Sequence, residues 1–400
     1  MFLFLLLFFS STLFTLTAFA SDKPVWTIDY KTLNLPEKGK PVSHAKWATI
    51  GTHDKPDPDF HVHLTQDNKI LVSFLHYKPQ SELEPLNKSK KFDTFFVALL
   101  LSTKNGELIR RVEWPLGEST LGQQIGHDSR IYPLPSGDYV GIIDKKLQVL
   151  NSSFDVIHDR VLDTLERGKG SYKIIVPLSG KYIVLKQIQS GARFAGIVEI
   201  IDSGTFETLE RFEQPDFEIV DIWKDRLLSI SNDGNDKSRF FEKKIGAFQW
   251  DVLGSTQWSI LHVLALIDSR RYANPRFIYN GTIIFRDIIE QPSAPTAPKG
   301  FFFMIEDGNK NGPFFEGCIS KPSWNTPNVA CGKSKLSAIR ELLDLFAKSW
   351  VEIFDLSTRK VLLTTKKSSD MVDYEISPDG NSIIIITQKK IELYTVKSKR

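Results

Sequence analysis

The end of the chain constrains the fold more than any other stretch. A Ser-Pro-Asp-Gly turn at Ser377–Gly380 leads into the apolar run Ile383–Ile386, and a third segment, Ile391–Val396, alternates apolar with polar residues. A strand that is apolar at every position needs cover on both faces of its sheet. Weaker copies of this unit recur upstream, so the pattern predicts a stack of small sheets that cover one another.

The spacing of the turns between first and second strands supports a repeat. These turns lie at Asn68, Gly137, Gly180, Asp225, Gly281 and Gly380. Units of four strands repeat at about 40 to 50 residues, and the long interval before Gly380 leaves room for one further, degenerate unit. The sequence therefore predicts an all-β protein, a seven-bladed β-propeller, with six or eight blades as alternatives. In the fourth unit we expect the third strand at Ala247–Val252.

The last unit contains only three strands, although a propeller must close into a ring. Val25–Tyr30 alternates as a strand should and belongs to no other unit. We predict that it supplies the missing strand and pairs with Ile391–Val396.

Three places resemble a known class of proteins. Trp350–Leu363 and Ile197–Glu207 resemble the hairpin of the outer strands of a blade, and Asp373–Val396 resembles the turn and strands that open one. These features are similar to those of WD-repeat-like (PD-type) β-propellers, and the broader class of exported bacterial propellers fits best. The resemblance implies a fold and no particular activity, because proteins of this class share a scaffold and differ in function.

The N-terminus is typical of a targeting segment. Phe2–Phe9 is continuously apolar, and Thr15–Ala20 ends in a small-x-small site. We predict a signal peptide at residues 1–20 with cleavage after Ala20, which leaves residues 21–400 as a single propeller domain, secreted or periplasmic. The alternative is an uncleaved membrane anchor.

The chain has two cysteines, Cys318 and Cys331. In an exported protein, an even count across a short loop predicts a disulfide. Two buried thiols are the alternative.

The sequence contains no motif that identifies an activity. The 51 basic and 48 acidic residues leave a net charge of +3, which argues against a dedicated nucleic-acid binder. Neither a nucleophile elbow nor a phosphate-binding loop is present. We therefore assign no catalytic residue and no cofactor.

His61 and His63 are the candidates that we name for a metal site. They alternate along one predicted strand and so share a face. The competing interpretation is a polar strand face at the central channel, which we favour.

These observations favour a non-enzymatic binding module for a protein, a peptide or a glycan, acting as a monomer through the long loops Lys78–Lys91 and Ile288–Lys299. The alternative is an enzyme that uses the channel, either a hydrolase or lyase or a quinoprotein-like oxidoreductase subunit. The triplets at Asn87, Asn151 and Asn280 are glycosylation acceptors if the source is a eukaryote.

Overall fold

The structure is a computed structural model of the 400-residue chain. It describes residues 23–33, 60–79, 91–120, 129–162, 170–176, 180–189, 196–213, 218–232, 238–255, 276–288, 300–306, 309–316, 319–334 and 349–396. These residues form seven four-stranded antiparallel sheets and one short 3-10 helix, η1 (Tyr30–Leu33).

Each sheet is one blade, and six of the blades are continuous in sequence. Blade 1 comprises β2 (Phe60–Leu64), β3 (Lys69–Pro79), β4 (Lys91–Ser102) and β5 (Leu108–Thr120). Blade 2 comprises β6 (Arg130–Pro133), β7 (Tyr139–Ile143), β8 (Lys146–Leu150) and β9 (Val156–Val161). Blade 3 comprises β10 (Gly170–Ile175), β11 (Tyr182–Gln189), β12 (Gly196–Asp202) and β13 (Thr208–Glu213). Blade 4 comprises β14 (Glu218–Trp223), β15 (Arg226–Asn232), β16 (Ser238–Lys244) and β17 (Asp251–Ser255). Blade 5 comprises β18 (Arg276–Phe277), β19 (Ile283–Ile288), β20 (Gly300–Glu306) and β21 (Asn309–Glu316). Blade 6 comprises β22 (Ile319–Pro322), β23 (Asn328–Ser334), β24 (Ser349–Asp355) and β25 (Lys360–Thr364).

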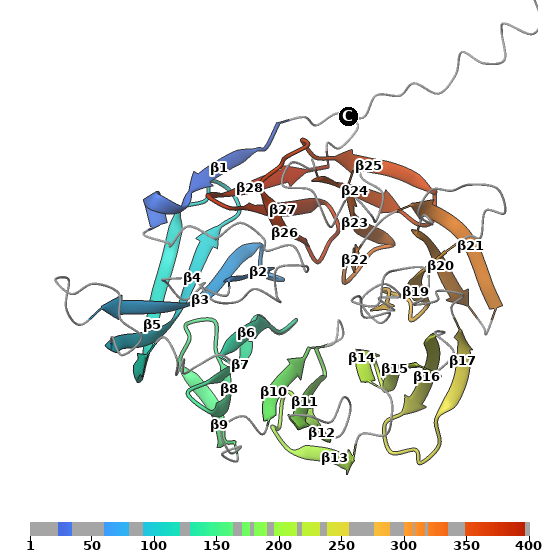
Figure 1. The fold of residues 1–400 in the computed structure, drawn as a ribbon, viewed down its shortest axis with the longest axis horizontal. Helices are drawn as coiled ribbons and strands as arrows, with labels where there is room; N and C mark the ends of the chain where they lie inside the picture. The colour runs from blue at the N-terminus through green and yellow to red at the C-terminus, as the bar shows by residue number, and fades with distance from the viewer. Residues whose placement is uncertain are drawn as a thin grey trace, which may run out of the picture.

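Blade 7 closes the ring with strands from both ends of the chain. It comprises β26 (Met371–Ile376), β27 (Ser382–Thr387), β28 (Lys390–Thr395) and the N-terminal β1 (Trp26–Asp29). β1 pairs antiparallel with β28, with Trp26 opposite Leu393 and Asp29 opposite Lys390 (Figure 1). The seven-bladed propeller and its closure by an N-terminal strand are therefore confirmed.

The second strand of a blade is buried because it has a neighbouring blade on each side. All five residues of β7 are buried, as are the five residues that follow Ser382 in β27. The side chains of β27 alternate between two cores: Ile384 and Ile386 pack toward blade 1, and Ile383 and Ile385 toward blade 6. This explains the uninterrupted isoleucine run in the sequence.

The turns between first and second strands contact the preceding blade. At Gly380, with φ of +70°, an added Cβ would lie 2.6 Å from the Asn328 Cβ of blade 6. At Gly281, with φ of +85°, it would lie 2.5 Å from the Trp223 ring of blade 4. Glycine is required at both turns because the backbone is left-handed and a neighbouring blade occupies the space of a side chain.

Two details of the sequence interpretation change. The third strand of blade 4 is β16, not the expected Ala247–Val252, whose first residues precede the outer strand β17. β16 was missed because its sequence, Ser-Arg-Phe-Phe-Glu-Lys-Lys, is mostly charged. Its Lys243 is nevertheless 5% exposed and pairs with Glu210 of blade 3, Nζ to Oε1, at 2.5 Å.

Several predictions fall on residues outside the described part of the chain: the signal peptide, Cys318, Asn87 and most of the loops Lys78–Lys91 and Ile288–Lys299. Cys331 is buried in β23, and its disulfide with Cys318 stays a prediction. Within the described segments, no helix has the length and apolarity needed to cross a membrane.

Candidate functional site in the central channel

Figure 1 shows the first strands β2, β6, β10, β14, β22 and β26 nearest the middle of the ring, where β26 is the first strand of blade 7. Neighbouring first strands contact one another across blade boundaries, as β2 does with both β26 and β6. Along β26, the half-buried Asp373 and Glu375 alternate with the buried Tyr374 and Ile376. The polar residues of these strands are therefore the side chains available to the channel.

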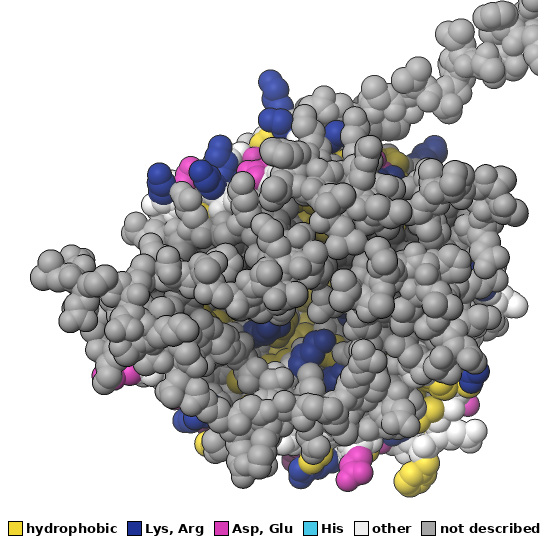
Figure 2. Space-filling view, viewed as in Figure 1, with side chains coloured by type: hydrophobic (Ala, Val, Ile, Leu, Met, Phe, Trp, Pro, Cys, Tyr) yellow, Lys and Arg dark blue, Asp and Glu magenta, His cyan; other side chains and the backbone are white. Residues whose placement is uncertain are grey.

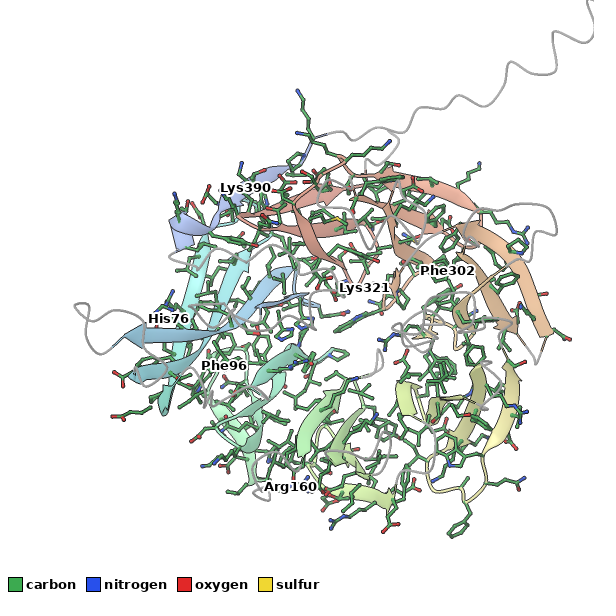
Figure 3. The ribbon with its side chains drawn as sticks, in the orientation of Figure 1. His76, Phe96, Arg160, Phe302, Lys321 and Lys390 are labelled. Atoms are coloured by element: carbon green, nitrogen blue, oxygen red, sulfur yellow. The ribbon has the colours of Figure 1, made fainter. Side chains whose placement is uncertain are left out.

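Lys321 of β22 is the centre of a charged network that joins blades 6 and 7. Its Nζ donates to Asp373 Oδ1 at 3.1 Å, to Glu375 Oε2 at 3.0 Å and to the Tyr374 carbonyl at 2.5 Å. These three acceptors match the three hydrogens of an ammonium group. Figure 3 shows the Lys321 side chain reaching from its strand toward the middle of the ring.

The network fixes the charges of its members. Burial alone would raise the pKa of Glu375, but Lys321 and His63 outweigh it and lower the pKa to about 2. Burial would likewise lower the pKa of Lys321, yet the Glu375 and Asp373 carboxylates raise it above its ordinary value. Both groups are therefore ionised across the physiological range.

His63 extends the network to blades 1 and 2. Its Nδ1 lies 3.8 Å from Glu375 Oε1, and its ring centroid lies 5.1 Å from that of Tyr132 on β6. His61 and His63 occupy alternate, half-buried positions on β2, as the sequence indicated. Among the described residues, no three His, Cys, Asp or Glu side chains gather in a way that could hold a metal ion. Within the described residues, no third side chain completes a metal site at His61 and His63.

A second polar contact joins the first strands of blades 4 and 5. The buried Asp221 accepts from the Phe277 amide through Oδ2 at 2.9 Å, and Arg276 donates to the Val220 carbonyl at 2.8 Å. Burial raises the pKa of Asp221, although the Arg276 charge and two backbone amides oppose the shift. This carboxylate is enclosed between blades and is structural.

The charges are distributed unevenly around the channel. Acidic residues occur on two first strands, Glu218 and Asp221 on β14 and Asp373 and Glu375 on β26. The first strands β2, β6 and β10 contain no Asp or Glu and carry His61, His63, Arg130, Tyr132, Tyr172 and Lys173. Figure 2 shows Lys and Arg side chains in the hollow at the middle of the ring. We call the channel side formed by β2, β6 and β10 the basic side.

Two tyrosines accompany the cations of the basic side. Tyr132 and Tyr172 are half-buried and pack at the margin of the apolar cluster between blades 2 and 3. Lys173 is exposed beside Tyr172, and Arg130 is half-buried two residues before Tyr132. Rings that are anchored in the core next to cations form a rigid surface with mixed polar and apolar character.

Comparison with known proteins supports the fold alone. No protein-family model matches the sequence, and no curated protein sequence is detectably similar. Among solved structures, an acylaminoacyl peptidase in complex with Z-Gly-Gly-Phe-chloromethyl ketone superposes with a TM-score of 0.52 at 10% identity, over 85% of this chain and 52% of that one. The acylaminoacyl peptidase of Pyrococcus horikoshii gives 0.50 at 9% identity, over 85% and 52%. The β-propeller domain of the Trilobed protease from Pyrococcus furiosus gives 0.49 at 9% identity, over 85% and 96%. The chain thus spans about half the length of the two peptidases, and it is a seven-bladed propeller without a family or WD-repeat assignment.

The sequence indicated one member of the channel network and missed the others. His63 was singled out as a possible ligand, whereas Lys321, Asp373 and Glu375 were not. The available signal was the alternation of Asp373 and Glu375 with Tyr374 and Ile376 on a first strand, since such alternation marks a polar face.

Proposed function

We propose that this protein is an exported, non-enzymatic interaction module that binds a protein or a peptide at the central channel. The observation that carries the proposal is the basic side, where the first strands of blades 2 and 3 carry Arg130 and Lys173 beside core-anchored tyrosines and that of blade 1 carries two histidines. The Lys321 network supports it as well, because it holds the adjoining wall of the channel, β22 and β26, in one arrangement. Export itself rests on the predicted signal peptide.

A site-specific photo-crosslink tests this proposal. Tyr172, on the channel strand β10, is replaced by p-benzoylphenylalanine in the full-length protein, expressed in its own organism and irradiated. Ile157, which is 47% exposed on the outer strand β9, receives the same residue as the matched control. We expect a discrete protein adduct from position 172 that position 157 does not give. The same adducts from both positions, or none from position 172, would contradict channel binding.

The channel-enzyme alternative predicts a different result. A purified propeller with a catalytic channel would turn over a substrate in a panel of peptides, esters and glycosides. Reproducible turnover, abolished by changes at the channel, would overturn the non-enzymatic proposal. If a glycan bound and no protein adduct formed, the ligand of the proposed binding module would be a carbohydrate instead of a protein or a peptide.

A further inference from the structure

Blade 7 carries a group of exposed lysines at one end of its sheet, on the outside of the ring. Three segments contribute to it: η1, the turn between β27 and β28, and the segment between β25 and β26. Their exposed lysines are Lys31, Lys366, Lys367, Lys389 and Lys390. We call this group the lysine rim. Figure 3 shows its member Lys390 at the outer edge of the ring, away from the channel.

Backbone hydrogen bonds bring the three segments of the lysine rim together. The amide of Tyr30, the residue before Lys31, donates to the Lys389 carbonyl at 2.8 Å. On the same turn, the Gln388 amide donates to the Asp370 carbonyl at 3.0 Å, so the segment between β25 and β26 adjoins the turn as well. Figure 2 shows Lys and Arg side chains at this edge of the molecule, near β1. The rim is therefore one continuous surface, although its lysines come from both ends of the chain.

The lysines of the rim have no carboxylate partner, unlike several lysines elsewhere in the ring. Lys69, Lys146 and Lys333 each form an ion pair with a nearby carboxylate. Within the described segments, no lysine of the rim forms an ion pair. Lys367 is held over the Trp350 ring, with its Nζ 4.7 Å from the ring centroid. The ammonium groups of the rim are therefore available to an external anion.

Carboxylates near the rim do not cancel its positive charge. Asp29, Asp370 and Glu392 lie on or beside the same end of the sheet, and each accepts a hydrogen bond from a donor of the chain itself. Five lysines outnumber these three acidic residues. Clustered cations attract anions over about a Debye length, roughly 10 Å at 0.1 M salt.

The shape and composition of the rim indicate which anion it suits. All of its cations are lysines, which are compact hydrated charges on flexible stems and lack the planar fork with which arginine binds one anion in two places. They extend from turns on an outer edge. Several mobile cations on such an edge suit the many phosphate groups of a lipid surface better than a single anion that needs a fitted pocket. The predicted export would also bring the protein to a membrane.

We propose that the lysine rim docks the propeller on a membrane that contains anionic phospholipids, with the lysines beside the phosphates of the headgroups. This interaction is separate from the proposed channel binding and does not depend on it. Because the rim lies on the outer edge of blade 7, docking leaves the channel open to a second partner.

Vesicle co-sedimentation tests the docking. The protein, in the form to which its own organism processes it, is mixed with vesicles of phosphatidylcholine alone or of phosphatidylcholine with phosphatidylglycerol. We expect binding to the anionic vesicles to be stronger by about tenfold or more. Binding should be lost at about 1 M salt, where the Debye length falls to about 3 Å.

Two double variants with reversed charge locate the contact. Lys389→Glu/Lys390→Glu changes the turn between β27 and β28, and Lys31→Glu/Lys366→Glu changes the other two segments. Each should lower binding to the anionic vesicles by about tenfold or more. Circular dichroism verifies that each variant is folded, and the second variant keeps the test decisive if the first does not fold.

The matched control is Lys145→Glu/Lys146→Glu. These lysines occupy the equivalent turn of blade 2, between β7 and β8, where Lys146 is paired with Asp159. The control changes the net charge by the same amount as each rim variant. Because it leaves the rim intact, binding to the anionic vesicles should stay at the wild-type level.

Three outcomes would overturn the docking: equal binding to the two kinds of vesicle, binding that resists salt, or equal losses in the rim and control variants. An acidic protein of the envelope that wild type retains and the rim variants lose, without any vesicle binding, would assign the rim to a protein partner instead. The crosslink from position 172 does not involve the rim, so failure of the docking leaves the proposed function standing.

Discussion

Blade 7 packs against blade 1 on one face and against blade 6 on the other, and the two contacts differ in chemistry. Toward blade 1 the contact is largely apolar, with Ile384, Ile386 and Ile28 in a cluster that includes Val72 and Leu99. Toward blade 6 there is also an apolar cluster, but the Lys321 network and a series of hydrogen bonds between turns are added to it.

The hydrogen bonds toward blade 6 surround the Ser-Pro-Asp-Gly turn. The amides of Trp324 and Asn325 both donate to the Pro378 carbonyl at 3.0 Å, and Asn328 Nδ2 donates to the Gly380 carbonyl at 3.2 Å. Apolar burial stabilises without fixing direction, whereas hydrogen bonds and ion pairs fix the relative position of two elements. The comparison indicates that burial holds the closing blade in the ring and that polar contacts set its orientation at the channel.

The largest expected effect on stability comes from removing a buried isoleucine from either face of blade 7. It tests whether apolar packing stabilises the two faces equally. Ile386→Ala, toward blade 1, and Ile385→Ala, toward blade 6, should each lower the free energy of unfolding by about 3 to 4 kcal/mol, because each leaves a cavity in a buried cluster. Urea denaturation of both variants measures this. A loss below 1 kcal/mol for Ile385→Ala alone would show that blade 6 holds the closing blade by polar contacts only.

Gly380→Ala tests the turn contact with blade 6. The variant combines a left-handed backbone with an added Cβ that would lie 2.6 Å from the Asn328 Cβ, and we expect a loss of about 2 to 3 kcal/mol. Gly137→Ala is the matched control, since its φ is +90° but no atom lies within 4 Å of the added Cβ. It should cost about 1 kcal/mol. Equal losses of unfolding free energy in the two variants would mean that backbone strain, and not the contact with blade 6, makes glycine necessary at position 380.

Lys321→Met tests the ion pairs at the channel. Removing the ammonium leaves Asp373 and Glu375 close together without their cation, and we expect a loss of about 2 kcal/mol, reduced from that of a fully buried pair by partial solvent access. Lys390→Met, at an exposed position on β28, should change stability by less than about 0.5 kcal/mol. Thermal denaturation of the two variants at neutral pH compares them directly. Similar melting temperatures would show that the Lys321 network contributes nothing to the stability of the contact between blades 6 and 7.

The smallest effect is the dependence on pH. The pKa of Glu375 is about 2 in the folded protein and roughly 4.3 in an unfolded chain, so its ionised form favours folding. This contribution is complete above the unfolded pKa and is lost as the pH falls from about 5 toward 2.

Wild type should therefore lose about 1 to 2 kcal/mol more than Glu375→Gln over this range. Denaturation curves of both proteins at several pH values measure the difference, and Ile386→Ala serves as a control that should follow wild type. Parallel curves for wild type and Glu375→Gln would place the pKa of Glu375 near its ordinary value.

The fold could be predicted largely because its determinants are local. Turn residues such as Gly137 and Gly281 mark the boundary between two strands, and an apolar run such as Ile383–Ile386 marks a strand covered on both faces. Closure could be predicted because a blade with three strands requires a fourth and Val25–Tyr30 was available. The strand β16 could not be predicted, because the residue that pairs with its buried Lys243 is Glu210, which lies in the preceding blade.

The channel network could not be predicted from the sequence either, because its members also lie in different blades. Lys321 and Glu375 are 54 residues apart and come from different blades. Only the ring geometry brings them together, and no local pattern in the sequence predicts which first-strand residues will meet. His63 was noticed for its side-chain chemistry, but its contacts with Glu375 and Tyr132 depend on blades 7 and 2 lying on either side of it.

The closure of blade 7 has a consequence for the order in which the chain folds. Tyr30 donates its hydroxyl to the Thr387 carbonyl at 2.5 Å, across 357 residues of sequence. Closing so long a loop has a high entropic cost, and β1 has no partner until β28 has been synthesised. Blades 1 to 6 are contiguous in sequence and can form before that. Of the strands that the structure describes, the first to be synthesised is thus the last to pair, and a chain truncated before Lys390 would leave β1 without its partner and the ring open.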